Sequence, residues 1–385
     1  MSSISHLDPG RPRELSLPEK VWSINWGLVL LVSLLACVGF GMLYSAANGH
    51  WDPWASKQII RYGVALGVML VVAVVDLKFW YRAAYPIYVI AFLLLVLVEV
   101  RGFIGMGAQR WIDLGVIQLQ PSEIMKVAAV LALARYFHNV GIDEIGKPLL
   151  LLVPAGLVLV PAALVMKQPD LGTALMLVLA GGIMFFLAGV RLWKFAILIA
   201  AGAAAAPLAW RFLKPYQKTR LVSFLDPESD PQGAGYHSLQ SKIAIGSGGS
   251  TGKGFLEGTQ SHLNFLPEKQ TDFIFTMLAE EWGLVGGLAL LALYTLVIIY
   301  GYFIAFRSRS HFGRLLALGI VVNLFLYVFI NTAMVMGLIP VVGVPLPLVS
   351  YGGTAMLTVM FGFGLLMSVY VHRDARIGRP GDADG

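Results

Sequence analysis

The sequence has little charge and a single cysteine. Charged residues make up 13% of the 385 residues and hydrophobic residues 57%, whereas soluble domains carry about 25% charged residues. This composition excludes an ordinary soluble domain and indicates a polytopic membrane protein. Cys37 lies within an apolar run, so the chain can form neither an internal disulfide nor a cysteine metal site. The net charge of +6 does not predict a nucleic-acid partner, because most cations flank apolar segments.

Long apolar runs predict the fold class. A membrane-spanning helix needs about 20 mostly apolar residues, and ten runs meet that requirement. We therefore expect an all-α polytopic membrane protein, a bundle of about ten transmembrane helices. The first run is too long for the core of a signal peptide, so we expect it to be retained. The candidate spans are 25–46, 58–76, 80–100, 121–138, 149–166, 171–190, 193–213, 273–306, 314–338 and 352–372.

Lysine and arginine are unevenly distributed between the connections. With a cytoplasmic N-terminus, fifteen of them lie at the cytoplasmic connections and termini, and five lie in the short outer connections. Because cations are enriched on the cytoplasmic side, we expect both termini in the cytoplasm. The predicted division is a cytoplasmic segment 1–24, a transmembrane domain 25–372 and a cytoplasmic tail 373–385.

One long polar interruption, residues 214–272, joins the seventh and eighth spans and faces outward in this topology. It gathers carboxylates, cations, amides and glycines, so we expect any chemistry to occur there, at the membrane surface. The apolar run that follows, 273–306, would be about 50 Å long as a helix, against a hydrocarbon thickness of about 30 Å. We therefore expect the segment from Asp272 to Glu281 to lie at the height of the lipid headgroups.

Asp272 closes this polar interruption and allows two interpretations. In the first, Thr271 is the N-cap of the following helix and Asp272 lies in its first turn, where the helix dipole favours an anion. In the second, Asp272 is a general base at the mouth of a membrane cleft. The two interpretations are compatible, and both stay open at this point.

A second polar group surrounds the start of the fourth span. Pro121 suits the first position of a helix, and Glu123 and Lys126 are three residues apart on one helix face, so they can form an ion pair. A lysine inside a membrane helix is nevertheless costly and suggests a functional site. Together with Arg110, Lys126 could hold an anionic headgroup. Asp170, before the sixth span, is interpreted as a helix cap.

The glycine-rich stretch 247–254 resembles a phosphate-binding P-loop but lacks residues which that motif requires. A flexible turn is the favoured interpretation, and a backbone cradle for a lipid pyrophosphate stays open. Carboxylates could hold Mg²⁺ or Mn²⁺, and we expect no nucleotide or organic cofactor. The prolines and glycines of 337–353 predict non-helical backbone, which a membrane tolerates where protein buries it or where it lines a wet cavity. We expect a re-entrant loop beside the cleft.

Several long stretches together resemble the SEDS family (shape, elongation, division and sporulation), and its elongation branch more than its division branch. The resemblance covers the chain from the first span onward. The matching stretches are GAQRWIDLG (107–115), QPSEIMK (120–126), QPDLGTAL (168–175), LDPESDPQGAGYH (225–237), QSKIAIGSGG (240–249), GKG (252–254), GTQS (258–261), FLPEKQTDFIF (265–275) and GVPLPLVSYGG (343–353).

The resemblance implies a peptidoglycan glycosyltransferase of the bacterial inner membrane that polymerises lipid II for cell elongation and rod shape. It implies release of undecaprenyl pyrophosphate, and it implies partnership with a class B penicillin-binding protein and other cell-elongation machinery. Asp272 matches the family's essential carboxylate. The candidate substrate-binding residues are Arg110, Glu123, Lys126, Lys253 and Glu268.

Two other classes of function stay open. A lipid II flippase would also have many spans with buried charges. Here, however, the polar residues cluster on one side, whereas transporter sites lie near the midplane, often at internal repeats. The third class is a non-catalytic scaffold that docks the penicillin-binding protein. A purified protein that polymerises labelled lipid II in detergent would be an enzyme, and neither other class predicts polymer.

Overall fold

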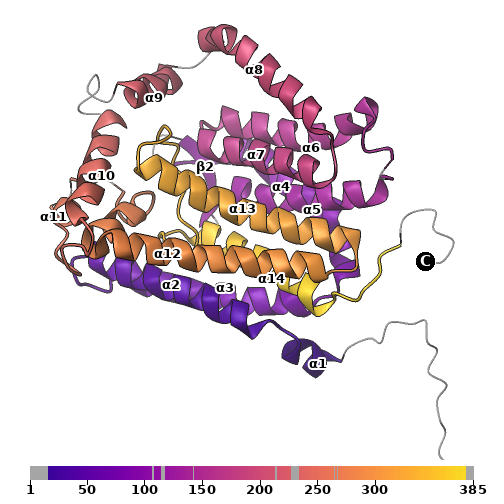
Figure 1. The fold of residues 1–385 in the computed structure, drawn as a ribbon, viewed down its shortest axis with the longest axis horizontal. Coiled ribbons are helices and arrows are strands. Elements are labelled where there is room, and N and C mark those ends of the chain that lie inside the picture. The colour runs from indigo at the N-terminus through magenta and orange to yellow at the C-terminus, as the bar shows by residue number, and fades with distance from the viewer. Residues whose placement is uncertain are drawn as a thin grey trace, which may run out of the picture.

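The computed structural model describes residues 16–105, 108–113, 118–141, 143–212, 215–226, 234–263, 265–266 and 268–378. Within these ranges the fold is a bundle of long helices (Figure 1) with one small antiparallel sheet of order β1-β2-β3. The predicted all-α membrane class is confirmed. The strands are β1 (Phe103–Gly105), β2 (Ala108–Asp113) and β3 (Gln118–Leu119).

Each of the ten predicted spans coincides with a helix to within a few residues. Seven helices of the described ranges are long and apolar enough to cross a bilayer, while α5, α7 and α8 are shorter or more polar, so a count of ten spans stays a prediction. A short helix, α1 (Leu17–Trp22), precedes them. The helices are α2 (Trp26–Ala46), α3 (Ala55–Val74), α4 (Leu77–Arg101), α5 (Pro121–Asn139), α6 (Pro148–Lys167), α7 (Leu171–Leu187), α8 (Leu192–Phe212), α12 (Ile274–Arg307), α13 (His311–Val335) and α14 (Gly353–Val371).

The core lies around α13, α14 and α5. Most side chains of α13 and α14 are buried, whereas fewer than a third of the side chains of α3, α4 and α6 are buried. In a membrane protein this division separates helices that pack against protein from helices that face lipid, because exposed leucine and valine are stable against hydrocarbon. Figure 1 shows α13 and α14 running through the bundle beside α12. These buried helices extend to the end of the molecule that carries the polar segment 214–272, where the candidate site lies.

Helix α12 is broken at Gly283, whose φ of 65° and ψ of −161° are not helical. The glycine-rich loop after α10 (Ala234–Gly248) fills the break and replaces the missing helical hydrogen bonds. Lys253 N–H donates to Glu280 O at 3.1 Å, Gly254 N–H to Glu281 O at 3.0 Å, Leu284 N–H to Gly249 O at 2.9 Å and Val285 N–H to Ser250 O at 3.1 Å.

This exchange corrects two expectations. The sequence predicts one over-long helix over 273–306, but the structure has two segments. The longer one, from Leu284 to Arg307, is about 36 Å long at about 1.5 Å per residue. For the stretch 247–254 the sequence favours a flexible turn, yet the structure packs this stretch against α12. A Cβ on Gly252 would lie 2.1 Å from Glu281 O. Because α12 carbonyls accept the N–H groups of residues 253 and 254, those two groups are not available to cradle a pyrophosphate.

The polar interruption 214–272 is more ordered than a water-facing loop. It contains α9 (Pro215–Leu225), α10 and α11 (Thr259–His262). Helix α10 packs along α12, where the buried Ser241 hydroxyl lies 2.7 Å from Thr276 Oγ1 and donates to Val335 O at 2.7 Å. Figure 1 shows α9 and α10 at one side of the bundle, after the outlying helix α8.

Residues 336–352, between α13 and α14, form no helix or strand, as their prolines and glycines predict. Leu346, Leu348 and Val349 are buried. A Cβ on Gly39 of α2 would lie 2.7 Å from Leu348 O, so α2 packs closely on this segment. The part from Val344 to Ser350 therefore meets the condition for non-helical backbone in a membrane, which is burial within protein.

Candidate active site

Asp272 lies in the turn 268–273, just before α12. The helix begins at Ile274, and its N-cap residue is Phe273, which makes no side-chain cap. The expectation that Thr271 is the N-cap is therefore wrong. The Asp272 side chain is half-buried and points at the non-helical segment 336–352, because a Cβ on Gly343 would lie 3.4 Å from Asp272 Oδ2.

Side chains from two other elements hold the backbone of this turn. The Asn331 amide of α13 donates to Asp272 O at 2.9 Å and to Val344 O at 2.7 Å. The Ser350 hydroxyl donates to Thr271 O at 2.6 Å. The carbonyl groups on both sides of the Asp272 peptide unit are thus fixed to buried groups, which limits how far the carboxylate can move.

A residue of α3 forms a hydrogen bond to Ser350, one of the residues that hold the Asp272 turn. Gln58 is fully buried, and its amide donates to Ser350 O at 2.9 Å. One turn further along, the guanidinium of Arg61 lies 4.7 Å from the centre of the Tyr351 ring, and Tyr351 N–H donates to Gln270 O at 2.8 Å. Helix α3 therefore reaches the Asp272 turn through the last residues of the non-helical segment 336–352.

Glu268 and Lys269 share the turn with Asp272 and differ in exposure. The exposed Glu268 carboxylate accepts from Gln270 Nε2 and from Thr271 Oγ1, each at 3.2 Å. Lys269 is buried, and its ammonium donates to Ser261 O at 2.9 Å. Burial lowers the pKa of Lys269, and the nearby Glu281 carboxylate opposes that shift. Glu268 thus presents a carboxylate on the surface beside Asp272, while Lys269 ties the turn to α11.

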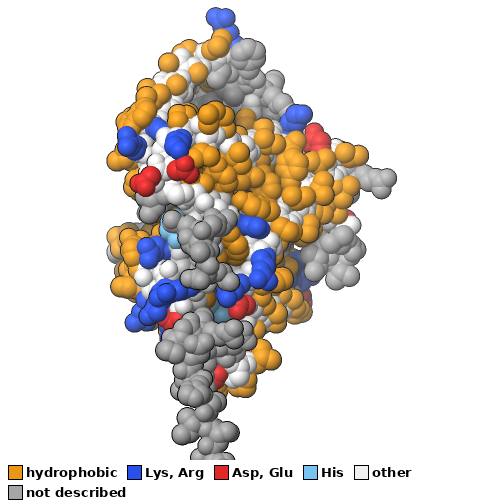
Figure 2. All heavy atoms as spheres, turned by 90° about the vertical axis from the view of Figure 1, so that its right-hand side faces the viewer, with side chains coloured by type: hydrophobic (Ala, Val, Ile, Leu, Met, Phe, Trp, Pro, Cys, Tyr) orange, Lys and Arg blue, Asp and Glu red, His pale blue; other side chains and the backbone are white. Residues whose placement is uncertain are grey.

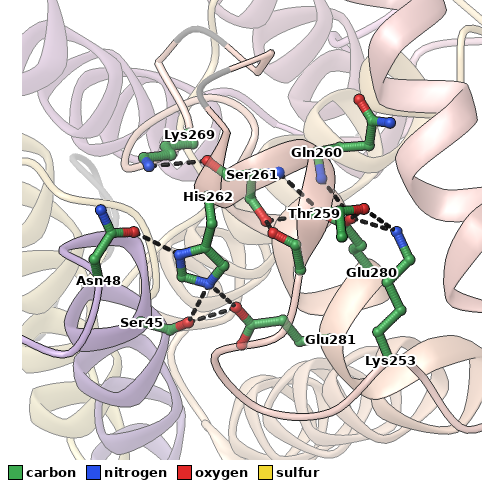
Figure 3. A network of polar contacts seen from close by, with 11 residues as sticks. Ser45, Asn48, Lys253, Thr259, Gln260, Ser261, His262, Lys269, Glu280 and Glu281 are labelled. Atoms are coloured by element: carbon green, nitrogen blue, oxygen red, sulfur yellow. Dashed lines mark hydrogen bonds and ion pairs between the residues drawn. The ribbon is translucent and has the colours of Figure 1, made fainter.

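Glu280 is the centre of the network drawn in Figure 3. Its buried carboxylate accepts from the Lys253 ammonium at 2.7 Å, from Gln260 N–H at 2.7 Å and from Ser261 N–H at 3.1 Å. Lys253 also donates to Thr259 Oγ1 at 2.6 Å. Lys253, predicted to bind substrate, is therefore engaged with Glu280, and this pair joins the glycine loop, α11 and α12.

Glu281 makes the corresponding connection to α2. Its buried carboxylate accepts from the Ser45 hydroxyl and lies 3.1 Å from His262 Nε2. The other ring nitrogen of His262 contacts the Asn48 amide oxygen (Figure 3). The two adjacent glutamates thus connect α12 to the glycine loop, to α11 and to α2, immediately before the break at Gly283.

Glu123 and Lys126 form the ion pair that their spacing predicts. Lys126 Nζ lies 2.7 Å from Glu123 Oε1, and both side chains are almost fully buried. The Tyr327 hydroxyl donates to Glu123, and Lys126 lies 4.1 Å from the centre of the Tyr327 ring. A cavity of about 30 Å³ adjoins the pair and is also lined by Asn323. That volume holds one or two water molecules rather than a sugar.

Arg110 also makes local contacts. Its guanidinium donates to Gln168 O at 3.1 Å and to Pro169 O. Asp170, next in the chain, caps α7 by accepting from Thr173 N–H at 3.1 Å, as predicted. Arg110 therefore fixes the connection between α6 and α7. The described contacts of Arg110 do not include the Glu123–Lys126 pair.

The predicted site residues fall into separate groups. Asp272 and Glu268 share one turn, and Lys253 belongs to the adjacent glutamate network, whereas the Glu123–Lys126 pair lies deeper, between α5 and α13. Sequence reasoning missed Asn331, Ser350 and Gln58, which hold the Asp272 turn. An amide in a largely apolar span was the available signal for Asn331, because such polar residues are costly there.

A family described as "Cell cycle protein" (FtsW, RodA and SpoVE) matches residues 21–375. Over 348 residues the chain is 47% identical to the peptidoglycan glycosyltransferase MrdB of Escherichia coli (strain K12), and the match covers 90% of this chain and 93% of that protein. Stage V sporulation protein E of Bacillus subtilis (strain 168) is 36% identical over 357 residues, with 89% of this chain and 95% of that protein covered.

Solved structures agree with these sequence matches. A chain described under "Structural coordination of polymerization and crosslinking by a peptidoglycan synthase complex" is 34% identical, with a TM-score of 0.78 and coverage of 91% of this chain and 98% of that one. The crystal structure of RodA, the rod shape determining protein of Thermus thermophilus, is 30% identical, with a TM-score of 0.66 and coverage of 91% and 97%. The resemblance drawn from the motifs is thereby confirmed, and the chain belongs to the FtsW, RodA and SpoVE family of cell cycle proteins.

Proposed function

We propose that this chain is a peptidoglycan glycosyltransferase that polymerises lipid II, with Asp272 as the general base. The named relatives support the activity, since MrdB of Escherichia coli is a peptidoglycan glycosyltransferase. The observation that carries the role of Asp272 is its position. Its half-buried carboxylate lies at the end of the polar segment 214–272, against Gly343, on a turn held by buried side chains.

The reaction requires a general base, and it requires no separate source of energy. The acceptor is a sugar hydroxyl, which is a poor nucleophile until its proton is removed, and the donor sugar already carries pyrophosphate as a leaving group. Asp272 takes the proton of the acceptor 4-hydroxyl while that oxygen bonds to the donor's anomeric carbon. The bond from that carbon to the pyrophosphate oxygen breaks, and the electron pair leaves with undecaprenyl pyrophosphate.

The leaving pyrophosphate needs positive charge nearby. Arg110, Glu123, Lys126, Lys253 and Glu268 are included in the proposal as substrate-binding residues. In this conformation Lys126 and Lys253 are each paired with a glutamate, so substrate would have to compete for them or meet them in another conformation. Glu268, which is exposed beside Asp272, could meet a lipid-linked sugar without rearrangement.

Mg²⁺ or Mn²⁺ would supply further positive charge. No group of three His, Cys, Asp or Glu side chains gathers among the described residues, so a cage made by the protein alone does not fit them. Mg²⁺ is usually bound through one or two carboxylates together with substrate phosphates. Asp272 or Glu268 would supply one carboxylate ligand to a divalent cation bound by the substrate pyrophosphate.

The proposal includes a class B penicillin-binding protein as partner, together with other cell-elongation machinery and membrane lipid. The relative described within a peptidoglycan synthase complex supports such an assembly. It also includes a location in the bacterial inner membrane with both termini in the cytoplasm and the segment 214–272 outside. The apolar helices support a membrane location, and the distribution of cations supports the orientation.

The deciding experiment measures glycan polymerisation by Asp272→Asn in detergent with labelled lipid II. This variant keeps the size of the side chain and removes its charge and basicity. Loss of a general base lowers rates by about 10²–10⁴-fold, so we expect a rate below about 1% of wild type. Glu257→Gln is the matched control, because it removes an exposed carboxylate from the same polar segment. A folded Asp272→Asn protein with more than about a tenth of the wild-type rate would contradict the base assignment.

A further inference from the structure

Asn331 is a buried amide in the apolar helix α13, one of the most buried helices of the bundle. It is fully buried, and its neighbours along the helix are largely apolar. The Asn331 amide oxygen accepts no hydrogen bond within the part of the chain that the structure describes. A buried polar atom without a partner costs free energy, so stability alone gives a poor account of an asparagine at this position.

The amide nitrogen of Asn331 joins the two segments that meet at the Asp272 carboxylate. One hydrogen bond, 2.9 Å long, goes to the carbonyl of Asp272 itself, and the other, 2.7 Å long, goes to the carbonyl of Val344. The residue before Val344 is Gly343, which the Asp272 carboxylate faces. A single NH₂ group, held by a rigid helix, therefore sets the distance between the carboxylate and the segment that it faces.

Neither of these hydrogen bonds touches the Asp272 carboxylate. Asn331 consequently leaves the chemical nature of the base unchanged and affects only its position. Gly343, which faces the Asp272 carboxylate, has a φ of +73°. Such backbone conformations are costly for other residues, which indicates that this segment also adopts one particular arrangement beside Asp272.

We propose that Asn331 is a positioning residue for glycan polymerisation, which holds the Asp272 carboxylate in place for the acceptor hydroxyl by fixing the Asp272 backbone against Val344. This inference rests on the proposed function of Asp272. Its consequence is a separation of kinetic constants. Displacement of the base should lower kcat, while KM for lipid II should stay close to the wild-type value, because Asn331 is buried and cannot contact substrate.

The experiment compares Asn331→Leu with Thr332→Val in the full chain with labelled lipid II. Leucine keeps the approximate shape of asparagine and removes both donors. A misplacement of about 1 Å can cost about 10²-fold in rate, so we expect kcat of Asn331→Leu to fall by about 10- to 100-fold with KM unchanged. Thr332→Val removes a buried hydroxyl whose 2.7 Å bond goes to Val328 O of the same helix, and it should keep the wild-type kcat.

A second variant covers the case in which Asn331→Leu does not fold. Asn331→Ser keeps a single donor, and we expect an intermediate kcat. Wild-type kcat in either folded variant would overturn the inference, as would a loss of rate that follows the folded fraction alone. If Asp272→Asn is inactive while Asn331→Leu is fully active, the positioning role fails and the base survives. If Asp272→Asn is itself active, the proposed function of Asp272 fails.

Discussion

Lys126 and Glu123 show how one buried residue can depend on another. The lysine is inside an apolar bundle, where an unpaired charge is expensive, and its stability there requires Glu123 at 2.7 Å and the Tyr327 ring. Removing one member of a buried ion pair leaves the other uncompensated, whereas removing both can be nearly neutral. The pair can therefore be tested for a role beyond stability.

We expect Lys126→Met to destabilise the protein by about 3–5 kcal/mol, because Glu123 is then left unpaired. The double variant Glu123→Gln with Lys126→Met should recover most of that stability. If Lys126 serves substrate binding, the double variant should still use lipid II poorly. Thermal unfolding in detergent measures the first effect, and the polymerisation rate against lipid II concentration measures the second. A stable double variant with wild-type kinetics would assign the pair to structure alone.

At the scale of the element, the break in α12 is the feature on which the polar end depends. The backbone groups of residues 280, 281, 284 and 285, which would have formed two hydrogen bonds between successive turns of α12, instead form four hydrogen bonds with the glycine loop. The adjacent carboxylates of Glu280 and Glu281 then bind side chains from the same loop, from α11 and from α2. The Asp272 turn lies at the start of the first segment of α12. The backbone and glutamate contacts that stabilise the break therefore also stabilise the position of this turn.

Gly252→Ala should disrupt this arrangement. Gly252 has a φ of +84°, and a Cβ there would lie 2.1 Å from the backbone oxygen of Glu281, so we expect a loss of about 1–3 kcal/mol and reduced polymerisation. Gly246→Ala is the matched control. A Cβ at Gly246, within α10, meets nothing within 4 Å, and alanine favours a helix by up to about 1 kcal/mol. Equal thermal stability of the two variants would contradict the packed loop.

The elements could be predicted from the sequence to very different degrees. The spans were found because the length of an apolar run is a local property, and the Glu123–Lys126 pair because three residues of helix fix its geometry. The break in α12 could not be found, because it depends on contacts between residues 249–254 and 280–285, about thirty residues apart. Asn331 was missed for the same reason, since its two acceptors lie on separate segments that only the tertiary fold brings together.

For the whole molecule, the distribution of charge along the bundle predicts its orientation. The connections that were assigned to the cytoplasm meet at one end of the molecule. Lys20 donates to Val74 O at 3.3 Å, Arg135 to Arg82 O at 2.9 Å, and Arg309 N–H to Arg373 O at 2.9 Å. Figure 2 shows Lys and Arg side chains gathered on the face that lies to the right in Figure 1, away from α10 and α11.

Cysteine labelling tests this orientation. In a Cys37→Ala background, we expect an impermeant thiol reagent to label Ser247→Cys in cells whose outer membrane has been made permeable, and to label Lys78→Cys only after the inner membrane is opened. Both positions are exposed. Ser310, which lies at the same end as Lys78, is unsuitable, because it is buried and caps α13. Labelling of Lys78→Cys alone in those cells would invert the topology. It would then place Asp272 on the cytoplasmic side, where the proposed reaction on outward-facing lipid II could not occur.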